Sequence, residues 1–169
     1  MSLCLVANWK LNGSKEFNHQ WALEFLRNFN GNNFSILGIA PASLYIDHLK
    51  TILTDYDIEI GSQNIDLEET GARTGEISAS MIKDLGCAFS IIGHSERRML
   101  FHETNQMICQ KLIQANNNSV IPILCIGESV EENKSNITFN VLKKQIIGAL
   151  KDVNELSSLI IAYEPIWAI

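Results

Sequence analysis

The chain has 169 residues, of which 46% are hydrophobic and 19% charged, with a formal net charge of −6. A chain of this length can bury one substantial core, so we expect a single domain over residues 1–169. The acidic balance argues against nucleic acid or an acidic membrane as the main partner. The first residues form neither a basic leader nor a long apolar run, which predicts a cytoplasmic protein without a signal peptide or membrane span.

Short apolar runs alternate with amphipathic segments along the whole chain. Strands are predicted over 3–8, 35–40, 59–63, 88–92, 120–126 and 158–164, and helices over 16–28, 45–53, 79–85, 104–115 and 141–153. Asn-Gly pairs at 12–13 and 30–31 predict turns. Because a crossover helix requires parallel strands on either side, the pattern predicts βα units with helices outside a buried parallel sheet.

Two architectures fit such a run of βα units. An open doubly wound sheet would carry a glycine-rich phosphate turn after its first strand, but the turn at 8–13 lacks that fingerprint. A (β/α)₈ barrel instead places catalytic groups at the carboxyl ends of several strands. Polar residues follow the predicted strands at Asn8 and Lys10, Gln63 and Asn64, His94 to Glu96, Gly127 and Glu128, and Glu164. We therefore predict an α/β barrel truncated after its sixth strand, with about three quarters of the barrel present.

The end of the first predicted strand carries Asn8 and Lys10, whose side chains leave on one face because they are two positions apart. A single Lys at such a place is more often a solvated surface charge. Glu96 can pair with Lys10 and hold its ammonium, or can form a surface ion pair with a neighbouring Arg.

The fourth predicted strand leads into His94, Ser95 and Glu96, with Ser95 expected as the N-cap of a helical turn. A helix amino terminus beside His94 disfavours the imidazolium, so the ring can stay neutral and donate a hydrogen bond. A satisfied structural histidine is the plainer interpretation.

Glu164 ends the sixth predicted strand, and alone it would more often be a cap or a solvated charge. The predicted barrel would bring a cation, a neutral imidazole and a carboxylate together at its carboxyl-terminal opening. Together these groups can remove a proton from a carbon next to a carbonyl and stabilise the enediolate that forms. The chain has no zinc-ligand spacing and no nucleophile elbow, so neither a metal nor a covalent nucleophile is expected. The cysteines at 4, 87, 109 and 125 lack Cys-x-x-Cys spacing and are expected to be buried free thiols.

Four segments, at 8–13, 93–98, 125–128 and 162–169, resemble the triosephosphate isomerase family, in order and at matching separations. The resemblance implies a TIM barrel that interconverts dihydroxyacetone phosphate and glyceraldehyde 3-phosphate without a cofactor, in glycolysis and gluconeogenesis. Glu164 would be the base, His94 the neutral electrophile and Lys10 the electrostatic clamp; this carboxylate and neutral histidine are a known property of the family. Asn8 would contact substrate, and Cys125 would lie behind Glu164, although a plain core thiol fits Cys125 equally well.

Residues 63–66 and 71–76 resemble the loop that docks into a partner subunit in this family. The resemblance implies a homodimer, with Gln63, Asn64, Thr74 and Gly75 in the docking loop and Thr74 near the partner's site. Arg73 stands where many family members have an aromatic or small residue. An exposed glycine-rich loop is the plainer interpretation.

The resemblance stops in the loop after the sixth strand, whereas family members continue for roughly another 80 residues. Three interpretations stay open: a piece of an ordinary isomerase, a truncated inactive product, or a non-enzymatic binding protein that docks through 64–76. The last would need a partner whose binding survives mutation of Glu164 but not of Thr74. A protein of these 169 residues alone is expected to have little isomerase activity and to aggregate through open sheet edges.

Overall fold

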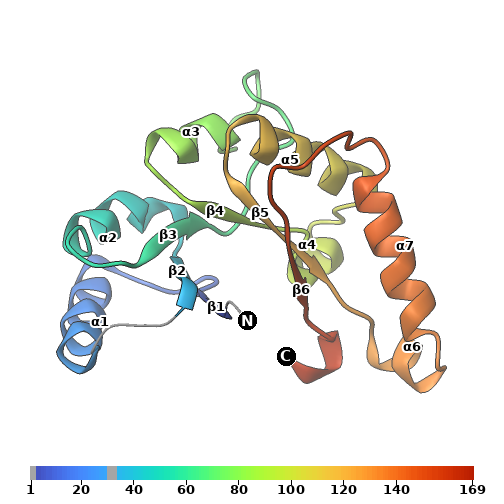
Figure 1. Ribbon diagram of the computed structural model, residues 1–169, viewed down its shortest axis with the longest axis horizontal. Helices are drawn as coiled ribbons and strands as arrows, with labels where there is room; N and C mark the ends of the chain where they lie inside the picture. The colour runs from blue at the N-terminus through green and yellow to red at the C-terminus, as the bar shows by residue number, and fades with distance from the viewer. Residues whose placement is uncertain (1–2, 30–33) are drawn as a thin grey trace.

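The computed structural model describes residues 3–29 and 34–169, and its sheet has six parallel strands in chain order. The strands are β1 (Leu3–Asn8), β2 (Phe34–Ala40), β3 (Glu59–Ser62), β4 (Phe89–Ile92), β5 (Ile121–Ile126) and β6 (Ile160–Tyr163). Every strand pairs in parallel with the next one along the chain. Figure 1 shows them following one another round an arc, with most of the helices on its outside and the helix labelled α4 within it. This order and curvature are those of a barrel wall and exclude the doubly wound alternative.

Each crossover between consecutive strands contains at least one helix. The helices are α1 (Lys15–Asn28), α2 (Ile46–Ile52), α3 (Ala79–Asp84), α4 (Ser95–Leu100), α5 (Asn105–Asn117), α6 (Val130–Lys134) and α7 (Thr138–Leu150), with short 3₁₀ turns η1 (Ser43–Tyr45) and η2 (Ile166–Ala168). Four helices begin after a hydroxyl side chain that accepts a backbone N–H of the first turn, from Ser14, Ser78, Thr104 and Ser129. These caps satisfy N–H groups that have no partner inside the helix.

The predicted strands agree with the structure to within two residues at each end. β6 ends at Tyr163, one residue before the predicted end, although Glu164 N still donates to Ile126 O at 2.8 Å. The largest shift is in α7, which begins three residues before the predicted position because exposed Phe139 and Asn140 break the apolar period. The turn predicted at 30–31 lies outside the described residues.

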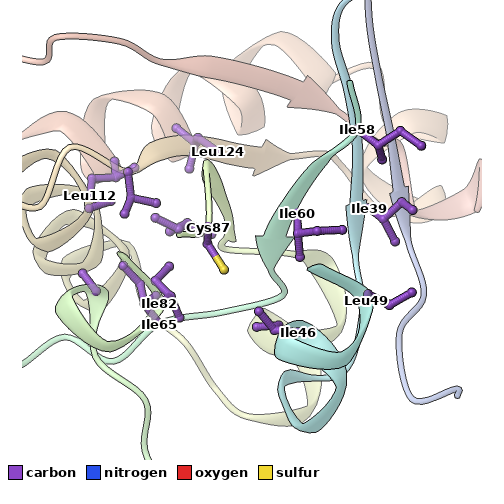
Figure 2. Close-up of a cluster of buried hydrophobic side chains, with 14 of the residues drawn as sticks. Ile39, Ile46, Leu49, Ile58, Ile60, Ile65, Ile82, Cys87, Leu112 and Leu124 are labelled. Atoms are coloured by element: carbon purple, nitrogen blue, oxygen red, sulfur yellow. The ribbon is translucent and has the colours of Figure 1, made fainter. Parts of the chain in front are cut away.

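Two apolar clusters lie on the two sides of the sheet. The larger one fills the space between strands and helices, and Figure 2 shows part of it, including Ile39, Ile60 and Leu124. The smaller one lies on the concave side around Phe89, which is fully buried. A Cβ added to Gly61 would lie 2.3 Å from the Phe89 ring, and one added to Gly38 would lie 2.6 Å from it. These two glycines therefore make room for the ring that fills the interior.

The two outer strands of the sheet carry exposed apolar side chains. Within the described residues, β1 pairs only with β2 and β6 only with β5. Leu3 and Leu5 on β1 are 56% and 51% exposed, and Ile161 and Tyr163 on β6 are 46% and 51% exposed. Because β1 lies at an edge, Cys4 is also exposed, so the expectation of four buried thiols was wrong for this residue. In the part of the chain that the structure describes, no helix is long and apolar enough to cross a membrane.

Candidate active site

Lys10 lies just beyond β1 in a backbone conformation that the neighbouring side chains hold in place. Its φ is +53°, a region that L-residues other than glycine, Asn and Asp rarely adopt. Asn8 Oδ1 accepts a hydrogen bond from Lys10 N at 3.0 Å, and Gln63 Nε2 donates to Lys10 O and Ala40 O, both at 2.9 Å. Local strain of this kind is common at functional sites.

The ammonium of Lys10 forms the expected ion pair with Glu96. Lys10 Nζ lies 2.8 Å from Glu96 Oε1, and both side chains are about two fifths exposed, at 36% and 41%. A pair this exposed adds little to stability. Its effect is to orient the ammonium toward the mouth of the sheet.

His94 caps the amino terminus of α4. Its Nδ1 accepts a hydrogen bond from Glu96 N at 3.3 Å, and Ser95 is the first helical residue, so the prediction of Ser95 as N-cap was wrong. The imidazole can take this place because Nδ1 of a neutral ring is an acceptor. An accepting Nδ1 leaves the ring proton on Nε2. The His94 side chain is 7% exposed.

Glu164 presents its carboxylate to His94 from the end of β6. Glu164 Oε2 lies 3.4 Å from His94 Nε2, and the Glu164 side chain is 37% exposed. The Oε2 atom itself is buried and has no hydrogen-bond partner among the described residues. A buried carboxylate oxygen without a donor is free to accept a proton.

The four predicted substrate-facing groups line one cavity. Its volume is about 280 Å³, and its lining consists of Asn8, Lys10, His94, Glu164, Pro165, Ala168 and Ile169. These groups leave β1, β4 and β6 at their carboxyl ends, as expected for a parallel barrel. A cavity near 300 Å³ suits a small molecule. A base, a neutral donor and a cation around one small ligand can move a proton between adjacent carbons.

Cys125 lies on β5 and lines a small space together with Glu164. Burial and, to a smaller extent, the adjacent Glu164 carboxylate raise the pKa of the Cys125 thiol to about 12, although Arg98 opposes the shift. The thiol is therefore neutral and presents no second charge to the base.

We expect Cys125 to resist alkylation because, with a pKa of about 12, only about one thiol in ten thousand is ionised at pH 8. Iodoacetamide at pH 8 should modify exposed Cys4 at least about a hundredfold faster, measured by peptide mass spectrometry. In denaturant all four cysteines should react at similar rates. Equal rates for Cys4 and Cys125 in the folded chain would contradict this placement of the thiol.

Gly127 lets the backbone of Glu164 approach the end of β5. A Cβ added to Gly127 would lie 2.0 Å from Glu164 O and 2.7 Å from Glu164 C. No side chain fits at that distance. Glycine is therefore required here because the Glu164 backbone lies so close, and not because of its own backbone angles. The sequence placed Gly127 at a strand end but contained no signal for this contact.

We predict that Gly127→Ala displaces Glu164 and destabilises the chain by about 1–3 kcal/mol, as overpacking does. Chemical denaturation measures the loss of stability, and the amide exchange rate of Glu164 measures the displacement of its backbone. An alanine variant with unchanged stability and rate would show that the two backbones can separate without cost.

Glu128, next in the chain, gathers donors from three elements. Its fully buried carboxylate accepts from Trp167 Nε1 at 3.0 Å, Asn133 Nδ2 at 3.0 Å and Tyr163 OH at 3.1 Å. Burial raises the pKa of Glu128, but these hydrogen bonds outweigh burial and leave the pKa below its ordinary value. The ionised carboxylate thus connects the segment after β6 to the end of β5.

A buried ionic cluster that sequence reasoning missed supports the other side of the site. Glu103 accepts hydrogen bonds from Arg97 and Lys111, and Lys111 also donates to Asn64 Oδ1. Burial lowers the pKa of Lys111, although Glu103 opposes that shift. Arg97 lies on α4, three residues after its N-cap His94, so the cluster ties α4 to the loop after β3. Arg97, Glu103 and Lys111 lie six and eight positions apart, a spacing that matches no recognised motif, and Asn64 is 47 positions from Lys111.

The predicted docking loop divides into an inner and an outer part. The side chains of Gln63 and Asn64 are engaged within the chain, by Lys10 and Lys111 respectively. Residues 71–76, which include Thr74 and Gly75, are exposed. Arg73 reaches back and donates to both carboxylate oxygens of Asp66. A role at an interface between subunits stays a prediction for this loop.

A separate cavity of about 320 Å³ lies between this loop and α4, lined in part by Gln63, Gly75 and Arg97. It contains neither Glu164 nor His94. Within the described residues, no group of three or more His, Cys, Asp or Glu side chains is placed to hold a metal.

The fold and the cavity together define a parallel α/β barrel protein with a polar cavity at the carboxyl ends of its strands. A profile of the triosephosphate isomerase family matches residues 3–169. Triosephosphate isomerase of Nitrosococcus oceani is 41% identical over 167 residues, covering 98% of this chain and 67% of that protein. The Buchnera aphidicola enzyme is 43% identical over 171 residues, covering 98% and 66%. The crystal structure of triosephosphate isomerase from Bartonella henselae superposes with a TM-score of 0.86 at 34% identity, covering 99% of this chain and 69% of that one.

The chain belongs to the triosephosphate isomerase family. It spans about two thirds of the length of the curated relatives that it matches. Its six parallel strands form the corresponding part of a TIM barrel.

Proposed function

We propose that this chain carries the proton-transfer site of a triosephosphate isomerase, which interconverts dihydroxyacetone phosphate and glyceraldehyde 3-phosphate. The observation that carries the proposal is the single cavity in which Glu164 Oε2 lies 3.4 Å from His94 Nε2, with Lys10 on the same lining. No cofactor is needed, because the reaction only moves protons between carbon and oxygen.

In the proposed reaction, the Glu164 carboxylate takes a proton from C1 of dihydroxyacetone phosphate, and the electron pair moves onto the C2 oxygen. His94 donates its Nε2–H to that oxygen, and Lys10 stabilises the negative charge of the enediolate. Glu164 then returns the proton to C2 while the C1 hydroxyl gives its proton back to His94 Nε2, so the C1 oxygen becomes the aldehyde and glyceraldehyde 3-phosphate results. Asn8 contacts the substrate beside Lys10.

The proposal includes a homodimer in the cytoplasm, in keeping with the family. The exposed loop at 71–76 supports the dimer, since a projecting loop can reach a second subunit. The alternatives are an inactive fragment and a non-catalytic binding protein, and both predict that no proton is removed from a triose phosphate.

Deuterium exchange tests the proposal directly. The purified chain is mixed with dihydroxyacetone phosphate in heavy water, and loss of the C1 proton signal is followed by NMR. We expect exchange above the buffer rate even if net isomerisation is slow, because exchange needs only the proton-transfer groups. A rate equal to that of buffer would refute the proposal.

A further inference from the structure

Gln145 lies on α7, outside the cavity, and pairs with the backbone at the end of β5. Its Oε1 accepts a hydrogen bond from Gly127 N, and its Nε2 donates to Gly127 O, both at 2.9 Å. A side-chain amide has one acceptor and one donor group in this arrangement, as a peptide does. Gln145 therefore bonds to Gly127 as a neighbouring strand would.

The backbone at the end of β5 needs such a side-chain partner because it extends past the end of β4, the neighbouring strand. The register between β4 and β5 ends with Ile92 opposite Leu124, and the chain then turns away at Gly93, whose φ is +71°. Beyond this point the next carbonyl on that side, Cys125 O, accepts from the Arg98 side chain at 3.3 Å. Side chains thus replace the absent strand.

On its other side, the end of β5 continues to pair with the chain that carries Glu164. Ile126 O accepts from Glu164 N at 2.8 Å, and Glu128 O accepts from Ile166 N at 3.0 Å. Because successive residues of an extended chain direct their backbone groups to opposite sides, Gly127 faces away from these bonds. Buried backbone groups need partners, and Gln145 supplies both partners of Gly127.

Gly127 in turn sets how closely Glu164 approaches. A Cβ on Gly127 would lie only 2.0 Å from Glu164 O, so the two backbones are in direct contact. A shift of the Gly127 peptide would therefore move the Glu164 backbone with it, and change the 3.4 Å separation between Glu164 Oε2 and His94 Nε2.

We propose that Gln145 is a positioning residue for proton transfer: by holding Gly127 it fixes the place of Glu164 relative to His94 and the substrate carbon. This inference rests on the proposed function. Gln145 does not itself line the cavity. Its contribution can be large because a displacement of about 1 Å at a reacting group can cost about a hundredfold in rate.

Gln145→Met tests the inference, since methionine matches the length of glutamine but forms neither hydrogen bond. Lys143→Met is the matched control, because Lys143 is exposed on the same helix. In the deuterium-exchange assay we expect Gln145→Met to lower kcat by about tenfold to a hundredfold with little change in KM. The Lys143→Met variant should stay within twofold of the original chain.

Gln145→Glu provides a second, pH-dependent readout. When protonated, the introduced carboxyl group can donate to Gly127 O and accept from Gly127 N, as the amide does. When ionised, it cannot donate and it repels the carbonyl. The rate of this variant relative to the original chain should therefore rise as the pH is lowered, whereas a purely structural role in helix packing predicts a constant ratio.

Backbone amide exchange separates failure of this inference from failure of the proposed function. If Gln145→Met frees the Gly127 amide but matches Lys143→Met in rate, or if the Gln145→Glu ratio is constant, the inference is overturned. If the original chain removes no proton from the substrate, the proposed function fails. In that case, the exchange of the Glu164 and Ile166 amides tests whether Gln145 fixes the position of Glu164. Faster exchange of these amides in Gln145→Met than in Lys143→Met supports the inference, and equal exchange overturns it.

Discussion

Glu164→Gln is expected to lower the rate of substrate proton exchange by about a thousandfold, within the range typical of lost general-base catalysis. The substituted amide keeps the size of the side chain but cannot take a proton at neutral pH. Because Glu164 Oε2 has no hydrogen-bond partner among the described residues, little stability should be lost with the charge. NMR measures the exchange of the C1 proton in heavy water, and denaturant titration measures the stability.

Glu24→Gln is the matched control, since Glu24 is an exposed carboxylate on α1 and far from the cavity. It should exchange protons at the original rate. If Glu164→Gln retained more than about a tenth of that rate, another group would be the base and the assignment of Glu164 would be wrong.

Lys10→Met is expected to lower kcat/KM by about a hundredfold to a thousandfold, the usual loss when a preorganised electrostatic group at a developing oxyanion is removed. Methionine keeps most of the length of the side chain but leaves the enediolate without a cation. The exchange assay at several substrate concentrations separates the effects on kcat and on KM.

Substitution of Glu96, the ion-pair partner of Lys10, should cause an intermediate loss of activity. Glu96→Gln keeps the ammonium but removes its 2.8 Å ionic anchor, so the loss should be smaller than for Lys10→Met. Lys143→Met, a change of the same type on an exposed helix face, should have no effect. Equal losses for Lys10→Met and Lys143→Met would exclude an electrostatic role for Lys10.

Most of the fold could be predicted from local sequence pattern, because apolar strands and amphipathic helices each have a hydrophobic periodicity that is recognisable within a short stretch of sequence. The positions of Asn8, Lys10, His94 and Glu164 followed as well, since parallel strands bring their carboxyl ends together. The cap of α4 was misassigned because serine is the usual N-cap, and only the conformation of the turn shows that His94 Nδ1 takes the N–H of Glu96.

The supports of the site were beyond sequence reasoning. Gln63 reaches Lys10 across 53 positions, and Gln145 reaches Gly127 across 18. Gln63 was expected at a strand end and in the docking loop, but nothing marked Gln145 or either contact in advance, because the partner in both cases is a backbone group common to all residues. Such contacts become visible only when the sheet has brought distant segments together.

The agreement between sheet order and chain order has a consequence for how this protein is made. Each strand from β2 to β6 pairs with the strand synthesised just before it, so its partner is already present when it appears. Because the entropy cost of closing a loop rises with its length, pairing with the preceding strand costs less than pairing with a more distant one. We expect the sheet to grow during translation by one βα unit at a time, with the last-made strand always at the growing edge.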